Sequence, residues 1–165
     1  MFRILLQVIG WKSTCYSTID EEKVRKFLKR AKYERRLELN TDISVKEALE
    51  KLGLLRGGKL TNATILLFGK NPQKNFLQAE TRCARFKGTA PLEFIDMKVF
   101  GGGIIDQRGD ALEFVKEHNE LHAKIVGTER VEKWEYPMAA IREAITNAIC
   151  HRDYETKSNV QVRIF

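Results

Sequence analysis

The first regular pattern of hydrophobic positions predicts a helix from Asp20 to about Leu37. Thr18 and Glu21 have the spacing of a capping box, which satisfies backbone N–H groups at a helix start. The other sides of the helix carry mostly Lys and Arg. Its apolar residues recur at the spacing of a single helical stripe and are Val24, Phe27, Leu28 and Ala31.

A short second helix is predicted from Val45 to Leu52. Ser44 and Glu47 form its capping box, and Gly53 stands where many helices end in a left-handed residue. The apolar run from Thr64 to Phe68 is bounded by polar residues and by a Gly- and Pro-containing turn. That run is compatible with a buried strand or with a buried helical turn.

Two alternating segments, Glu80 to Lys87 and Leu92 to Phe100, predict the strands of a hairpin joined by a turn over residues 88–91. The glycines at 101–103 interrupt this pattern. A long helix is predicted to follow and to end near Val126. Its apolar stripe comprises Ala111, Phe114, Val115, His118, Leu121, His122 and Ile125.

The last part of the chain combines strand and helix patterns. Residues 129–135 alternate weakly, and residues 159–165 alternate clearly enough to predict a final strand. Between them, Tyr136 and Pro137 open a helix that runs to about Cys150, because the missing N–H of proline does no harm in a first turn. We therefore expect an α+β fold, a mixed sheet with both later helices packed on it.

The composition supports a folded protein. The chain has 165 residues, of which 43% are hydrophobic, and a formal charge of +7 from 29 Lys and Arg against 22 Asp and Glu. This length allows one compact domain or two small ones, and it needs no metal or disulfide to fold. We expect a basic helical connector over residues 1–55 and an α+β region over residues 56–165, with the strands between Leu60 and Phe100 as its central layer.

The cysteines and the N-terminus favour the cytoplasm. Cys15, Cys83 and Cys150 are too few and too scattered for a disulfide framework, which fits a reducing compartment. The apolar run from Met1 to Ile9 is far shorter than the ~20 residues that cross a bilayer. It also has no small-residue cleavage site, so we expect neither a signal peptide nor a membrane partner.

The basic first helix is a candidate nucleic-acid interface. Arg25, Lys29, Lys32 and Arg36 lie along one of its sides, and clustered Lys and Arg are the electrostatic signature of binding to a phosphate backbone. The alternative is a solvated face of a basic protein, because no recognition motif and no interleaved aromatic residues accompany the charges.

Two histidines on the predicted long helix are a weaker candidate. His118 and His122 are one turn apart, as metal-binding pairs are, but Glu120 does not directly follow the first His as the zinc-protease motif requires. We expect both side chains to pack against the core. The triplet His151 to Asp153 resembles part of a kinase catalytic loop, but Ser158 stands where that motif requires Asn.

The helix after Pro137 carries the most informative pair. Glu143 and Asn147 are one turn apart, so both side chains can reach one ligand. A carboxylate can orient a water molecule and an amide oxygen can bind the magnesium ion of a nucleotide, although such pairs also occur on solvated helices. We place Cys150 on the same side. The predicted buried stripe is Met138, Ile141, Ile145, Ala148 and Ile149.

The segment from Arg142 to Tyr154, REAITNAICHRDY, closely resembles the motif of a family of prokaryotic transcriptional regulators. These proteins are often described as ATP-dependent DNA helicase RecG-related. They join an N-terminal Schlafen/AlbA-like DNA-binding domain to an ATPase-like domain of the gyrase, chaperone, histidine-kinase and MutL (GHKL) superfamily. The other stretches that match are Glu47 to Leu55, Gly58 to Ala63, Leu67 to Pro72 and Arg82 to Gly88.

The resemblance implies a nucleotide site on this helix, with ATP and Mg²⁺ as cofactor. Asn147 would hold the magnesium ion and Glu143 would orient the attacking water. His151, Arg152 and Asp153 match signature positions of the family and are predicted to lie at the cofactor. The resemblance also implies that this chain is the middle of a longer protein, with an incomplete GHKL ATPase-like part.

The predicted function is therefore a piece of an ATP-binding, DNA-associated transcriptional regulator. DNA contact is expected mainly through a preceding domain, of which residues 1–17 would be the tail. Helicase activity is not expected, because no helicase motif is present. Two alternatives stay open. One is a non-enzymatic dimerisation or interaction module that has lost nucleotide binding, in keeping with an expected homo-oligomer, and the other is a direct nucleic-acid binder that uses the basic helix.

Overall fold

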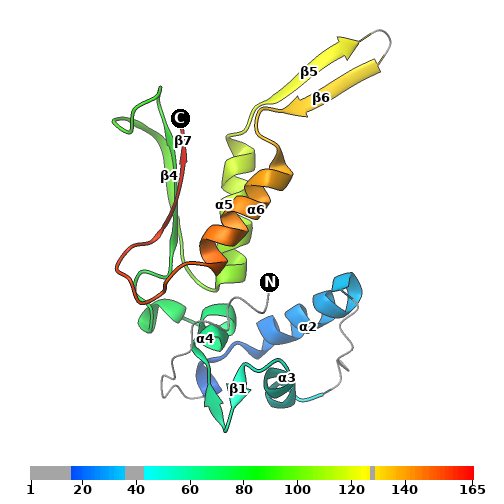
Figure 1. Cartoon of the computed structure of the whole chain (residues 1–165), viewed down its shortest axis with the longest axis vertical. Helices are drawn as coiled ribbons and strands as arrows, with labels where there is room; N and C mark the ends of the chain where they lie inside the picture. The colour runs from blue at the N-terminus through cyan, green and yellow to red at the C-terminus, as the bar shows by residue number, and fades with distance from the viewer. Residues whose placement is uncertain (1–15, 36–42, 127–128) are drawn as a thin grey trace. The chain divides into compact units, whose positions relative to one another are not determined.

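The computed structural model describes residues 16–35, 43–126 and 129–165 and confirms the predicted α+β fold (Figure 1). The chain forms two compact units, Met1–Leu77 and Gln78–Phe165. The boundary predicted between residues 55 and 56 falls inside strand β1 (Leu55–Arg56). The divide lies later because the short hairpin that contains β1, and the buried helix after it, belong with the N-terminal helices.

The N-terminal unit is mainly helical. The run that the sequence left ambiguous is helix α4, and all seven of its residues are buried. Thr61 caps α4, since its Oγ1 accepts a hydrogen bond from the Thr64 backbone N–H at 3.3 Å. The described elements of this unit are η1 (Tyr16–Thr18), α2 (Glu21–Arg35), α3 (Val45–Lys51), β1, β2 (Lys59–Leu60), α4 (Asn62–Phe68) and η2 (Pro72–Lys74).

Helix α2 begins at Glu21, and Asp20 caps it in place of the predicted box with Thr18. The Asp20 carboxylate accepts hydrogen bonds from the backbone N–H groups of Glu22 and Lys23, at 3.1 and 3.2 Å. An aspartate directly before the first turn is close to the free N–H groups, and its negative charge is favourable at the positive end of the helix dipole.

Helix α3 follows its predicted boundaries closely. Ser44 Oγ accepts from the Glu47 backbone N–H at 3.1 Å, as the capping box requires. Gly53 has a φ of +71°, a left-handed conformation that side chains disfavour, and so confirms the predicted helix end.

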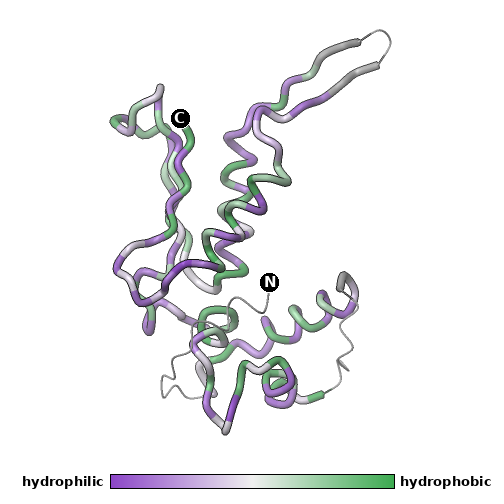
Figure 2. Tube along the Cα trace, viewed as in Figure 1, coloured by the Kyte–Doolittle hydropathy of each residue, from purple (hydrophilic) through white to green (hydrophobic). Residues whose placement is uncertain are grey.

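The second unit is a three-stranded sheet with two helices beside it (Figure 1). The strand order is β4-β3-β7, with β4 antiparallel and β7 parallel to β3, so the sheet is mixed as predicted. Helices α5 and α6 alternate hydrophobic and hydrophilic residues along their length (Figure 2). The elements are β3 (Thr81–Phe86), β4 (Phe94–Phe100), α5 (Ile104–Glu117), β5 (Leu121–Val126), β6 (Glu129–Trp134), α6 (Met138–Cys150) and β7 (Val160–Ile164).

The predicted long helix is wrong in its last third. Helix α5 ends at Glu117, and the segment predicted as its C-terminal turns is strand β5, antiparallel to β6. Asn119 fixes the base of this β5–β6 ribbon, because its side chain donates to the Tyr136 carbonyl at 2.9 Å and accepts from the Tyr136 N–H at 3.0 Å. Pairing with β6 satisfies the backbone hydrogen-bonding groups of β5, so this segment has no need of helical hydrogen bonds.

Gln107 ties α5 to the sheet. Its side-chain carbonyl accepts a hydrogen bond from Thr81 Oγ1 at 3.0 Å, and its amide donates to the carbonyls of Ala79 and Gly102 at 2.7 and 2.9 Å. Gln107 is only 2% exposed, so these contacts are shielded from water. A buried amide with three partners stabilises one arrangement of helix and strand.

Ionisable side chains are buried in this unit, and Cys83 and Tyr154 are among them. Cys83 of β3 is fully buried, and burial raises the pKa of its thiol to about 12. Tyr154 is also buried and donates a hydrogen bond to the Ile149 carbonyl at 2.7 Å, and burial raises the pKa of its hydroxyl as well. Both groups are therefore held in their neutral forms by folding.

Replacing Gln107 by Leu is expected to lower the free energy of unfolding by about 1–3 kcal/mol, because it removes three buried hydrogen bonds that join α5 to the sheet. Urea unfolding followed by circular dichroism measures the change. Glu113→Gln is the matched control, since Glu113 is exposed on the same helix and should change stability by less than about 0.5 kcal/mol. Equal stability of the two variants would contradict this role of Gln107.

Stability is expected to fall in alkali. The ordinary pKa is 9.0 for a thiol and 10.0 for a tyrosine, and folding raises both for Cys83 and Tyr154, so unfolding releases protons once the pH exceeds about 9. The contribution is complete below that pH and decreases towards pH 12. Urea unfolding at pH 7 to 11 should show a shallower decrease for the double variant Cys83→Ala/Tyr154→Phe. The same slope in both proteins would contradict the assignment.

Candidate functional site

Helix α6 carries the candidate site. Pro137 stands at its N-cap. Of the predicted buried stripe, Ile145 and Ile149 are buried, but the prediction is wrong for Ala148, which is exposed. Cys150 was expected with Glu143 and Asn147 on the side opposite the buried stripe, but unlike that pair it is buried. Helix α5 packs against α6 next to this residue, where Arg108 Nε donates to Thr146 Oγ1 at 2.8 Å. A small apolar side chain near the helix end is covered by that packing.

The structure brings the predicted pair together. Asn147 Nδ2 donates a hydrogen bond to Glu143 Oε1 at 3.0 Å, and both side chains are exposed. His151 lies one turn further along the same side of the helix, where its backbone N–H donates to the Asn147 carbonyl at 2.9 Å. Its side chain is exposed too. Three polar side chains therefore share one open side of α6.

Arg152 belongs to the loop that follows α6. Its guanidinium lies over the ring of Tyr154, 4.8 Å from the ring centroid, and also donates to the carbonyl of Ser158. Burial lowers the pKa of this guanidinium, and its Nε is buried without a hydrogen-bond partner in the described part of the chain. Through these contacts Arg152 holds Tyr154 and Ser158 of the loop together.

Asp153 shapes the same loop. It is exposed, and its Oδ1 accepts from the Glu155 backbone N–H at 2.9 Å, the pattern of an Asx turn. Thr156 Oγ1 donates to the Asp153 carbonyl at 2.9 Å. Arg152 and Asp153 thus make their contacts within the loop, whereas His151 stands on the same side of α6 as the Glu143–Asn147 pair.

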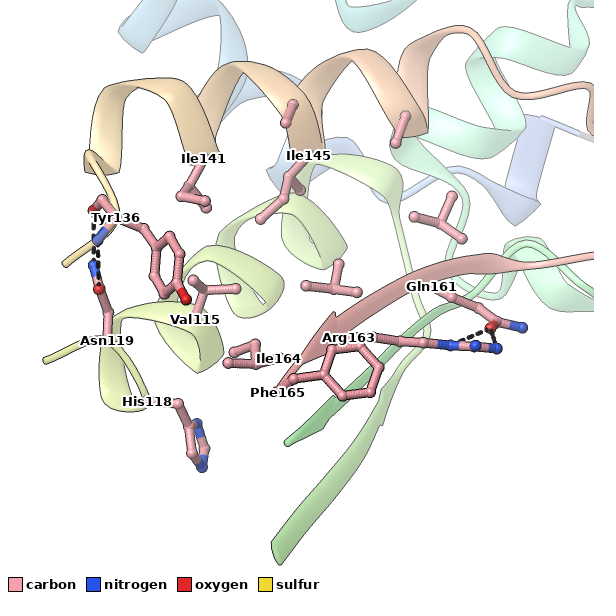
Figure 3. A pocket seen from close by; sticks show the side chains of 14 residues that line it. Val115, His118, Asn119, Tyr136, Ile141, Ile145, Gln161, Arg163, Ile164 and Phe165 are labelled. Atoms are coloured by element: carbon pink, nitrogen blue, oxygen red, sulfur yellow. Dashed lines mark hydrogen bonds between the residues drawn. The ribbon is translucent and has the colours of Figure 1, made fainter. Parts of the chain in front are cut away.

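A cavity on another side of α6 was not predicted from the sequence. It has a volume of about 430 Å³ and lies between α5, α6 and β7 (Figure 3). Ile141 and Ile145 point from α6 into it, with Ala144 and Ala148 beside them, whereas Glu143 and Asn147 do not line it. Two alanines one turn apart were its only sequence signal, because small residues leave room beside a helix.

The basic helix presents most of the predicted cations to solvent. Arg25, Lys29 and Lys32 are exposed on α2, and Arg36 lies outside the described residues. On the neighbouring side, Lys26 forms an exposed ion pair with Glu22 at 2.7 Å. The first fifteen residues of the predicted N-terminal tail, which spans residues 1–17, also lie outside the described part, and with them Cys15.

The two histidines do not form a metal pair on one helix. His118 caps the end of α5, where its Nδ1 lies 2.8 Å from the Phe114 carbonyl and its Nε2 lies 3.4 Å from the Asp96 carboxylate. His122 is exposed on strand β5. The expectation that both pack against the core is wrong for His122. Across the described ranges, no group of three or more His, Cys, Asp or Glu side chains is placed to hold a metal ion.

The described helices include none that combines the length and the apolar character needed to cross a membrane.

No model of a known protein family matches the sequence, and no curated protein matches it. Among solved structures, the chain is similar to the DIP2311 protein from Corynebacterium diphtheriae, with a TM-score of 0.71 and 19% sequence identity. The match covers 93% of this chain but 30% of that protein, so this chain spans less than a third of its length. At this identity the likeness shows the fold alone.

Proposed function

We propose that this chain is part of an ATP-binding, DNA-associated transcriptional regulator of the RecG-related family, and that α6 supplies its nucleotide-facing residues. The observation that carries the proposal is the hydrogen-bonded, solvent-exposed pair of Glu143 and Asn147. The pair occurs within the segment from Arg142 to Tyr154 that resembles the family motif.

The geometry of the pair suits magnesium-nucleotide chemistry. Because Asn147 turns its amide nitrogen towards Glu143, its side-chain oxygen is directed to the other side, where it can face a cation. Oxygen atoms of amides and carboxylates are the ligands that Mg²⁺ prefers. The second carboxylate oxygen of Glu143 can orient a water molecule towards the terminal phosphate. When bound, ATP with Mg²⁺ supplies the phosphoryl group and neutralises its charge.

The position of the pair also supports a regulatory role. Glu143 and Asn147 lie on the exposed side of a helix whose other sides pack against α5 and border a cavity. A nucleotide bound there changes the charge around α6. The resulting shift of the helix can alter its packing against α5. We do not propose helicase activity, since the sequence carries no helicase motif.

Titration of the chain with a fluorescent ATP analogue and Mg²⁺ should show saturable binding. Asn147→Ala should weaken it at least about tenfold, equivalent to about 1.4 kcal/mol. Glu143→Gln should retain binding and remove any hydrolysis, because an amide cannot accept the proton of the attacking water.

The control for this titration is Glu113→Gln, which alters a comparable exposed pair with Lys116 on α5, 3.2 Å apart, and should bind the analogue as the wild type does. Binding that is unchanged in Asn147→Ala would place the nucleotide elsewhere. A complete lack of binding by the wild-type chain would contradict a nucleotide site on this helix.

A second candidate function is direct nucleic-acid binding through α2. It rests on the exposure of Arg25, Lys29 and Lys32 along one side of a helix in a chain with a net charge of +7. Such a stripe can follow a phosphate backbone without reading its sequence.

If α2 binds DNA, affinity for a short duplex should fall steeply with salt, by about 0.9 in the slope of log affinity against log salt for each phosphate contact. The triple variant Arg25→Ala/Lys29→Ala/Lys32→Ala should reduce this slope by about 2–3. The charge-matched control Lys46→Ala/Lys74→Ala/Lys157→Ala removes three exposed cations elsewhere and should change it little. A slope equal in both variants would exclude α2 as the interface.

A further inference from the structure

Charge is distributed unevenly between the two units of the chain. Residues 1–77 contain 16 Lys and Arg against 8 Asp and Glu, whereas residues 78–165 contain 13 against 14. The excess positive charge of the protein therefore belongs to the N-terminal unit. Such an asymmetry between two parts of one chain indicates a polyanionic partner for the basic part.

Helix α2 has one side that packs within its own unit and one side that does not. Val24 and Leu28 are buried, and the ring of Phe27 lies against that of Phe68 with the ring centroids 5.5 Å apart. The apolar stripe of the helix is therefore already covered by the described part of the unit. What α2 presents on its outer side is mainly charge.

Three cations on this outer side have no acidic partner. Arg25, Lys29 and Lys32 are exposed, and across the described ranges no carboxylate forms an ion pair with any of them. A protein surface that packed over this side would remove these charges from water, which is costly unless each charge is paired. A phosphate backbone neutralises them and gains free energy from the release of its counterions. A polyanion therefore suits this side of α2 better than a further protein surface does.

Tyr33 lies among these cations. It is 91% exposed, more than any other large hydrophobic residue in the described part of the chain. Lys29 and Arg30 precede it by one turn, so both are its neighbours on the helix surface. Arg25, Lys29 and Tyr33 follow one another at steps of four residues and form a single row. The expectation that no aromatic residue is interleaved with the charges is therefore wrong for Tyr33.

An exposed aromatic ring in a row of cations suits unpaired bases. The bases of a duplex are already stacked in its interior, so a helix that follows the phosphate backbone does not reach their faces. In a single strand the base faces are accessible, and stacking on aromatic side chains beside a basic track gives binding that tolerates any sequence. Arg25 and Tyr33 are separated by about 12 Å along the helix axis. That length corresponds to about three to four nucleotides at the ~3.4 Å spacing of a stacked strand.

We propose that this side of α2 binds single-stranded DNA. The ring of Tyr33 stacks on one base, and Arg25, Lys29 and Lys32 contact the phosphates that lead to it. The proposal rests on the second candidate function, nucleic-acid binding through α2, and names its ligand. It does not involve Glu143 and Asn147, which belong to the other unit.

The probe is fluorescein-labelled oligo(dT) of about twelve nucleotides, a length within the site sizes of single-strand binding folds. It is titrated into the 165-residue chain and followed by polarisation, beside a duplex of the same length. Tyr33→Ala should weaken binding of oligo(dT) by about five- to hundredfold, the value of one stacked base, and should leave the affinity for the duplex unchanged.

The salt dependence separates stacking from charge. Because the ring of Tyr33 contacts no phosphate, Tyr33→Ala should leave the slope of log affinity against log salt unchanged. Lys29→Ala should reduce that slope by about 0.7, the value of one phosphate contact with a single strand.

Two further variants at the same position test the ring itself. Tyr33→Phe retains an aromatic face and should bind oligo(dT) as the wild type does. Tyr33→Leu retains an apolar side chain without such a face and should bind as weakly as Tyr33→Ala. The side chain is exposed, so these variants should have the stability of the wild type in urea unfolding.

Several results would overturn the proposal. Wild-type affinity of Tyr33→Ala for oligo(dT), or an equal loss for single strand and duplex, would exclude stacking. Tighter binding of the RNA oligo(U) than of the DNA oligo(dU) would make RNA the ligand. Concentration-dependent dimerisation that Tyr33→Ala abolishes would make a second copy the occupant of this side.

The duplex measurement distinguishes the failure of this proposal from that of the function on which it rests. Salt-dependent duplex binding without any effect of Tyr33→Ala on oligo(dT) would remove only the single-strand site. A wild-type chain that binds neither form of DNA would remove nucleic-acid binding through α2 as well.

Discussion

The parallel pairing of β3 with β7 is the constraint on which the second unit depends. Parallel neighbours cannot be joined by a tight turn, so the chain must cross over before it returns to the sheet. Helices α5 and α6 lie in this crossover and pack against each other and the sheet. As a result α6 has a buried apolar side, an apolar side that borders a cavity, and a polar side that is open to solvent and carries Glu143 and Asn147.

Elements determined by local patterns were predictable from the sequence. The Ser44 cap and the β3–β4 hairpin depend on residues close together in the chain, and both were found. The segment Leu121–Val126 was mistaken for helix because its apolar positions fit either period. Its state depends on contacts with β6 and on the bonds between Asn119 and Tyr136. Such pairing does not show in a local window.

The features of the candidate site can also be separated into those that local sequence determines and those that depend on distant contacts. The Glu143–Asn147 contact follows from helix geometry, because residues one turn apart are neighbours wherever a helix forms. The burial of Cys150 was not predicted, because burial is determined by the elements that pack against α6, and these are distant in the sequence. The cavity could not be predicted, since it depends on how α5, α6 and β7 are placed against one another. The fold alone does not identify a ligand or a partner. For these, the proposed function depends on the resemblance of the segment from Arg142 to Tyr154 to the family motif.

The β5–β6 ribbon extends away from α5 and α6 (Figure 1), and its second strand leads within a few residues into the first turn of α6. Asn119 holds the backbone of Tyr136 at this junction by two hydrogen bonds. These two bonds join the base of the ribbon to the residue that precedes Pro137 and the first turn of α6. The helix that carries both the polar pair and the cavity wall is therefore anchored at its start to the end of α5.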